Sequence, residues 1–264
     1  MQYILLLLLS LLTSCASYQG TQSYTVVEDV YYTAKKTDRL RGEVYIPHGP
    51  GPFPGVVLVH GGGWQLRDLS DMRSIAKSLA SHGFVVFNIN YRLAPKYRHP
   101  VPVDDLASAL AYFKSHAELY RLNPEKMGLW GYSSGGHTVS YYALVRGGVQ
   151  AVVTGGAPYD FRWYPKSPYI KSYTGAYRND ALDKYIEASV VNKVTETSPP
   201  FFIYHAKEDK LVEFAQATNF EARFLALKRP VKRHDISWWG HAFAFALNDE
   251  AVEKGVEFLQ KNLR

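Results

Sequence analysis

The chain has 264 residues, of which 47% are hydrophobic and 20% charged, and its formal net charge is +6. This balance is typical of one globular domain of moderate size and excludes a disordered, collagen-like or coiled-coil chain. The basic residues are scattered rather than gathered in stripes, so the charge predicts no nucleic-acid partner. The single cysteine excludes an internal disulfide.

The N-terminal segment carries an almost wholly apolar run over residues 4–12, interrupted only by Ser10. A membrane-spanning helix needs about 20 residues, so this run fits the central part of a secretory signal. The run leads to Leu12-Thr13-Ser14-Cys15, which resembles the lipobox of bacterial lipoproteins. The resemblance implies that Cys15 becomes a lipid-bearing N-terminus. A plain cleaved signal and an uncleaved anchor are the alternatives.

These patterns divide the chain into three parts. We expect a signal peptide with the lipobox cysteine over residues 1–15, a polar tether over 16–23, and one folded domain over 24–264. The protein would then be exported and held in the bacterial cell envelope through Cys15, facing the periplasm or the exterior. Ala16-Ser17 lacks the Asp that would indicate inner-membrane retention, which favours the outer membrane by the same resemblance.

Strand and helix patterns alternate through the domain. Residues 24–34 and 40–46 predict two strands joined by a turn at 35–38, and 55–59 is a short apolar run typical of a buried strand. Further strands are predicted at residues 84–89, 127–130, 149–153, 201–205 and 231–238. Helices are predicted at residues 72–81, 103–116, 134–145, 214–227 and 245–259. This alternation predicts a mainly parallel sheet covered by helices on both faces.

Residues 159–199 interrupt the alternation. They are rich in Tyr, Pro, Ser and Asn, and residues 183–188 give their clearest helical pattern. We expect a small lid-like insertion or pocket wall here rather than a second domain.

A serine motif stands between a predicted strand and a predicted helix, and reads Gly131-Tyr132-Ser133-Ser134-Gly135. That context is required of a nucleophile elbow, in which the serine occupies a sharp strand-to-helix turn. The residues two positions away crowd this turn, so both must be very small. The motif predicts Ser133 as the nucleophile of an acyl transfer, with a glycine-rich turn that has no chemistry as the alternative.

A glycine run directly follows the predicted strand 55–59 and reads His60-Gly61-Gly62-Gly63-Trp64. It matches the HGGG type of oxyanion loop. Backbone amides must approach the negative oxygen of the tetrahedral intermediate to about 3 Å, and glycines permit that approach. We predict Gly61, Gly62 and Ser134 as the amide donors and His60 as a structural residue. A phosphate-binding loop would need a Lys-Ser/Thr pair or a dinucleotide spacing, and the sequence has neither.

Two later loops supply the remaining groups. Asp209 follows the predicted strand 201–205, at the carboxyl end where open α/β sheets bind ligands; Glu208 is the alternative acid. His241 is expected in a loop ahead of the last helix, with a capping or surface histidine as the alternative. The order Ser133, Asp209, His241 is that of the α/β-hydrolases. His241 would move the proton of Ser133 to the leaving alcohol, while Asp209 orients its ring.

Three ordered motifs together resemble the hormone-sensitive-lipase-like and BD-FAE-like carboxylesterases. They are residues 60–64, residues 131–136, and Asn90-Tyr91-Arg92-Leu93-Ala94-Pro95. The resemblance covers about residues 40–155 and 200–245. It implies an eight-stranded α/β-hydrolase sheet and hydrolysis of short acyl esters, and it gives Arg92 and Asp105 structural roles.

The sequence therefore predicts a serine carboxylesterase that acts on a small ester and needs no cofactor, since its histidines show no paired metal-ligand spacing. Its candidate pocket residues are Trp64, Tyr132, Trp163 and Tyr164, each with simple packing as the alternative. An amide hydrolase of arylformamidase or peptidase type could use the same triad, with His241 protonating a poorer leaving group. A non-catalytic binding module on a hydrolase scaffold is the alternative from another class, although it would normally lack a triad member.

Overall fold

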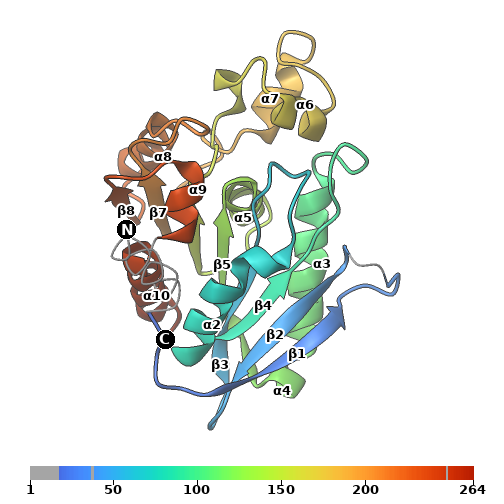
Figure 1. Cartoon of the computed structure of the whole chain (residues 1–264), viewed down its shortest axis with the longest axis vertical. Helices are drawn as coiled ribbons and strands as arrows, with labels where there is room; N and C mark the ends of the chain where they lie inside the picture. The colour runs from blue at the N-terminus through green and yellow to red at the C-terminus, as the bar shows by residue number, and fades with distance from the viewer. Residues whose placement is uncertain (1–17, 37–38, 248) are drawn as a thin grey trace, which may run out of the picture.

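The computed structural model describes residues 18–36, 39–247 and 249–264, and within them eight strands form one sheet in the order β1-β2-β4-β3-β5-β6-β7-β8 (Figure 1). The strands are β1 Tyr24–Tyr31, β2 Arg41–Pro47, β3 Phe53–Val59, β4 Val85–Ile89, β5 Leu122–Tyr132, β6 Ala151–Gly155, β7 Phe201–Ala206 and β8 Val231–Ile236. β2 pairs antiparallel with β1 and with β4, and the remaining pairings, from β4 through β3 to β8 in the sheet order, are parallel. The predicted eight-stranded, mainly parallel α/β-hydrolase sheet is confirmed.

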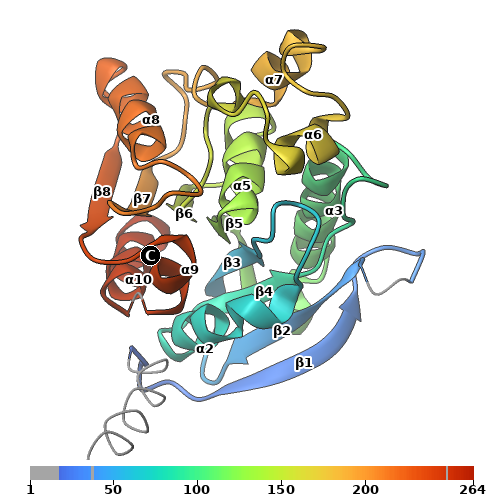
Figure 2. The same cartoon turned by 45° about the horizontal axis from the view of Figure 1, so that its top comes forward.

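Helices cover both faces of this sheet, as predicted (Figure 2). They are α2 Arg73–Ser81, α3 Val101–Ser115, α4 Ala117–Tyr120, α5 Ser134–Val145, α6 Pro168–Thr174, α7 Leu182–Ala188, α8 Ala215–Ala226, α9 His241–Ala246 and α10 Asp249–Leu263, with short 3₁₀ turns η2 Leu69–Met72 and η3 Phe161–Trp163. The apolar sides of α2 and α10 pack in one core, and those of α3, α5 and α8 pack in the other. Because both faces are covered, β4, β6 and β7 are buried along their whole length.

The segment between β6 and β7 leaves the sheet and forms η3, α6 and α7 (Figure 1). It corresponds to the predicted insertion at residues 159–199. The buried side-chain amide of Gln216 fixes its first residues, because Gln216 Oε1 accepts hydrogen bonds of 2.8 Å from the backbone N–H groups of Tyr159 and Asp160.

The chain after β8 differs from its prediction. Residues 245–259 were expected as one helix, but α9 ends at Ala246 and α10 begins at Asp249. Asp249 and Glu250 occupy the first turn of α10, where negative charge stabilises a helix start. His241 is the first residue of α9, with Gly240 as its N-cap, and does not lie in a loop ahead of the helices.

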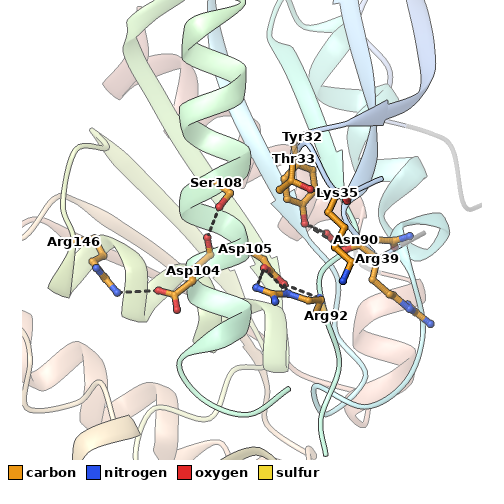
Figure 3. A network of polar contacts seen from close by, with 10 residues as sticks. All are labelled: Tyr32, Thr33, Lys35, Arg39, Asn90, Arg92, Asp104, Asp105, Ser108 and Arg146. Atoms are coloured by element: carbon orange, nitrogen blue, oxygen red, sulfur yellow. Dashed lines mark hydrogen bonds and ion pairs between the residues drawn. The ribbon is translucent and has the colours of Figure 1, made fainter. Parts of the chain in front are cut away.

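An ion pair ties the segment after β4 to α3 (Figure 3). The backbone N–H and the guanidinium of Arg92 donate to the buried carboxylate of Asp105 over 2.6 to 3.1 Å. The next turn of this segment supports the oxyanion loop, since the Ala94 N–H donates to the Trp64 carbonyl over 2.8 Å. This arrangement is consistent with the structural role expected of Arg92 and Asp105.

The predicted signal peptide and Cys15 lie outside the described residues. Part of the predicted tether is described, and it lies against the end of α2: Gly20 N–H donates to Ser81 Oγ over 2.8 Å, and the Tyr18 ring stacks on His82. Within the described ranges, no helix combines the length and the apolar character that a membrane crossing requires.

Candidate active site

Ser133 occupies the sharp turn between β5 and α5, with φ 53° and ψ −123°. Such a backbone conformation is strained for a residue with a side chain and is typical of functional sites. The glycines on either side make the turn possible. A β-carbon at Gly131 would overlap the Gly135 backbone, and one at Gly135 would overlap the carbonyl oxygens of Val59 and His60. This is the steric requirement that the serine motif predicted.

The structure brings the three residues predicted to carry the chemistry into one hydrogen-bonded series. His241 Nε2 lies 2.9 Å from Ser133 Oγ, and His241 Nδ1 lies 2.6 Å from Asp209 Oδ2. A carboxylate can only accept, so the Nδ1–H donates to Asp209 and Nε2 is free to accept the serine proton. The arrangement is that of a nucleophile, a base and an orienting acid.

Asp209 is buried and firmly held. Its Oδ1 accepts hydrogen bonds of 2.9 Å from the backbone N–H groups of Leu211 and Val212. Burial alone would raise the pKa of the Asp209 carboxyl, but hydrogen bonds from His205, His241 and Val212 hold this pKa well below its usual range. Glu208, the alternative acid, is exposed to solvent.

His205 is a contact of this acid that the sequence analysis missed. Its buried ring places Nε2 2.8 Å from the Val212 carbonyl and 3.4 Å from Asp209 Oδ2. The signal available in the sequence is that His205 stands four residues before Asp209, at the end of β7.

The oxyanion loop bends tightly beside Ser133. Gly62 and Gly63 have φ values of 107° and 61°, which glycine adopts without a steric penalty. A β-carbon at Gly61 would lie 3.3 Å from the Ser133 β-carbon, so the loop backbone lies directly beside the nucleophile. Among the loop, turn and cap hydrogen bonds between backbone groups of the described residues, none is donated by the amides of Gly61, Gly62 or Ser134. Gly61, Gly62 and Ser134, the three predicted donors, all line the same pocket as Ser133.

Aromatic packing supports this loop from behind. The buried Trp64 ring stacks on Tyr173 of α6 with 4.3 Å between ring centroids, and its Nε1 lies 3.3 Å from Thr138 Oγ1. His60 Nδ1 lies 2.7 Å from the Gly61 carbonyl, and burial lowers the pKa of His60 to about 4. Burial likewise lowers the pKa of His137 to about 3. Both rings are therefore neutral structural groups near neutral pH.

Ser133 and His241 line a pocket of about 650 Å³. The predicted pocket residues Trp64, Tyr132 and Tyr164 line it too. Trp163 is not among its lining residues in the described part of the chain, and its side chain is 44% exposed. The short η3 turn buries Phe161 and leaves Trp163, two residues further on, exposed to solvent, so the prediction that Trp163 lines the pocket is corrected. The lining residues that sequence analysis missed include Leu66, Tyr169, Ile170, Leu211, Phe243 and Phe245.

No cluster of three or more His, Cys, Asp or Glu side chains suited to a metal ion occurs within the described ranges.

The chain is similar to known ester hydrolases. It is 29% identical over 218 residues to the probable carboxylic ester hydrolase LipM of Mycobacterium tuberculosis, covering 73% of this chain and 50% of LipM. It is 26% identical over 247 residues to the acetyl esterase of Salmonella schwarzengrund, covering 82% of this chain and 76% of that protein. The chain thus spans about half the length of the mycobacterial relatives LipM and LipC.

Solved structures share the fold. A truncated carbohydrate esterase from gut microbiota superposes with a TM-score of 0.84 at 20% identity, covering 92% of this chain and 97% of that one. A bacterial heroin esterase superposes with a TM-score of 0.75 at 22% identity, covering 98% of this chain and 89% of that one. The family model described as BD-FAE matches residues 43–224, well over half of the chain. The chain therefore belongs to the BD-FAE family and has the α/β-hydrolase fold.

Proposed function

We propose that this protein is a serine carboxylesterase that hydrolyses short-chain acyl esters. The observation that carries the proposal is the series from Ser133 Oγ through His241 to Asp209, with contacts of 2.9 and 2.6 Å, opening into a pocket of about 650 Å³. The likeness to the Salmonella acetyl esterase and to LipM supports the same class of substrate.

The reaction begins when Ser133 Oγ attacks the acyl carbon and His241 Nε2 takes the hydroxyl proton. The carbonyl oxygen becomes negatively charged and accepts hydrogen bonds from the amides of Gly61, Gly62 and Ser134. The bond to the alcohol then breaks, and His241 returns the proton to the leaving oxygen. Water repeats the sequence on the acyl-enzyme and releases the acid. Asp209 stabilises the imidazolium in each half.

The preference for short acyl groups is supported by the insertion that bounds the pocket and by the likeness to the Salmonella acetyl esterase. Tyr169 and Ile170 of α6 line the pocket, and a β-carbon at Gly63 would lie 2.5 Å from the Tyr169 ring. This close contact joins the insertion to the oxyanion loop and limits the space beside the scissile carbonyl.

The first test is hydrolysis of p-nitrophenyl acetate, butyrate and decanoate by the wild type and by Ser133→Ala. We expect acetate and butyrate to be better substrates than decanoate, and kcat to fall by roughly 10⁴-fold or more in the variant. Equal activity of the two proteins would remove Ser133 from the mechanism. A wild type inactive on every ester but active on the matching anilides would replace the esterase proposal by an amidase.

The acid can be tested in the same assay. Asp209→Asn removes the charge that stabilises the imidazolium, and we expect a loss in kcat on the order of 10³- to 10⁴-fold. Glu208→Gln, which changes the adjacent exposed carboxylate, is the matched control and is expected to keep wild-type kcat. The reverse result would make Glu208 the acid.

We also propose, on the sequence alone, that the protein is exported and lipid-anchored through Cys15, with the outer membrane as its location. Expression of the full chain in a bacterial host with labelled palmitate tests this. We expect label on the wild type and none on Cys15→Ser; label on both would exclude Cys15 as the site.

A further inference from the structure

Two large apolar side chains beside the catalytic groups are exposed to solvent. Phe243 is 61% exposed and Leu211 is 53% exposed, and both line the pocket. The Trp239 ring extends this surface, with its centroid 5.9 Å from that of Phe243. Exposed hydrocarbon of this size has a cost in water, which a bound apolar group would remove.

The positions of these side chains are tied to the base and the acid. Phe243 stands two residues after His241 within the same short helix α9, and both residues line the pocket. Leu211 stands two residues after Asp209, and its N–H is held by Asp209 Oδ1 over 2.9 Å. Phe243 and Leu211 are thus close in the chain to the base and the acid, and both line the pocket that contains His241.

The chemistry of ester cleavage decides which part of the substrate meets Phe243 and Leu211. The leaving oxygen must come within hydrogen-bond reach of His241 Nε2 to receive its proton. The carbon attached to that oxygen then continues past His241, toward Phe243 and Leu211. The acyl carbon chain takes the remaining direction, along the wall of Tyr169 and Ile170 beside the oxyanion loop.

We propose that Phe243 and Leu211 form a platform for the alcohol part of the ester and that they select apolar, preferably flat, alcohols. This inference rests on the proposed esterase function. The other pocket residues from these two segments are Val212, Ala242, Phe245 and Ala246, none of which carries a charge. The charged lining residues, Arg67 and Asp71, come from the segment that follows the oxyanion loop. The alcohol selected by the platform is therefore uncharged.

Ethyl acetate, butyl acetate and 2-phenylethyl acetate separate this effect from intrinsic reactivity, because all three release primary alcohols of similar basicity. We expect kcat/KM of the wild type to rise roughly tenfold from ethyl to 2-phenylethyl acetate. Phe243→Ala and Leu211→Ala are each expected to reduce the ratio of these two values about fivefold. Phe243→Leu keeps apolar bulk without the ring and should give an intermediate ratio. Trp163→Ala removes an exposed aromatic side chain outside the pocket and should leave the ratio unchanged.

A second series varies the acid instead, with ethyl acetate, ethyl butyrate and ethyl phenylacetate. The proposal is overturned if Phe243→Ala changes the relative kcat/KM values of this acid series as much as those of the alcohol series. It is also overturned if the wild type and Phe243→Ala have the same ratio of kcat/KM for 2-phenylethyl acetate to kcat/KM for ethyl acetate. A wild type inactive on all these esters and on p-nitrophenyl acetate would instead refute the proposed function. An active wild type with no preference among the alcohols would refute only the platform.

Discussion

The hydroxyl of Tyr132 donates a 2.6 Å hydrogen bond to the backbone carbonyl of His241, which lies 109 residues further along the chain. The residue that precedes the nucleophile thus holds the main chain of the base. The spacing between Ser133 and His241 therefore depends on a direct bond across the sheet edge as well as on the fold of two separate segments.

Tyr132→Phe removes this bond and keeps the ring. We expect a loss of about 1 kcal/mol in the free energy of unfolding. Because the base is then less well positioned, we also expect kcat to fall on the order of tenfold. Tyr159→Phe is the control. The buried hydroxyl of Tyr159 forms a 2.8 Å hydrogen bond with Thr154 Oγ1, and neither residue lines the pocket. Tyr159→Phe should lose similar stability and keep kcat; an equal loss of kcat in both variants would refute the positioning role.

Gly62→Ala tests the oxyanion loop. The backbone of Gly62 has φ 107°, and an added β-carbon would overlap the Leu66 carbonyl oxygen, so the loop must move. We expect kcat to fall roughly 100- to 1,000-fold as amide donors leave their positions. Gly148→Ala is the matched control, because Gly148 also has a positive φ, 76°, but has open space around it. Its cost should be about 1 kcal/mol of stability, with kcat unchanged.

Arg92→Ala tests the ion pair behind the oxyanion loop. It leaves the carboxylate of Asp105 buried without its guanidinium, and we expect a loss of about 3 kcal/mol in stability, measured by urea unfolding. Arg146→Ala breaks the neighbouring pair with Asp104, whose two side chains are 50% and 48% exposed (Figure 3). That exposed pair should contribute less than about 1 kcal/mol. Similar losses of stability in the two variants would show that burial of Asp105 does not make its ion pair more important than the exposed pair.

The buried histidines predict a loss of stability in acid. Burial lowers the pKa of His60 from 6.5 to about 4, so between these pH values the unfolded chain binds a proton that the native state does not. Stability is therefore full above pH 6.5 and falls as the pH drops. By pH 4.5 this one group should cost about 2 to 3 kcal/mol.

His60→Asn should reduce the difference in unfolding free energy between pH 7.5 and pH 4.5 by that amount. Burial also lowers the pKa of His137, so this residue should preserve part of the dependence of the unfolding free energy on pH. Tyr91→Phe is the control, because it removes the hydroxyl that donates to the His60 carbonyl over 3.1 Å without changing the titrating ring. It should lower stability by the same amount at both pH values. If the difference in unfolding free energy between the two pH values were unchanged in His60→Asn, His60 would not be the group responsible.

The parts of the site that could be predicted from the sequence are those with a local requirement. Ser133 needs very small residues on both sides, the oxyanion loop needs glycines, and Asp209 follows a buried strand. Each requirement leaves a mark within a few residues of the group concerned. The central strands β4, β6 and β7 were predictable for the same reason, since strands buried on both faces read as largely apolar runs.

The remaining parts depend on contacts between distant segments. Trp163 and Tyr164 are adjacent aromatic residues, and only the packing of η3 decides that Tyr164 lines the pocket and Trp163 does not. Likewise, nothing near Tyr132 in the sequence indicates that its hydroxyl reaches His241. Phe243 stands two residues after the predicted base His241, but nothing near it in the sequence indicates that it lines the pocket.

The stack between Trp64 and Tyr173 has a consequence for protein engineering. The insertion between β6 and β7 is an obvious segment to exchange among relatives in order to change substrate range, because the triad stands outside it. Its Tyr173 ring, however, supports the Trp64 of the oxyanion loop with 4.3 Å between ring centroids. A transplanted insertion must therefore bring its own flat ring to this position. A chimera without such a ring would gain a new specificity but would have a weakened oxyanion loop.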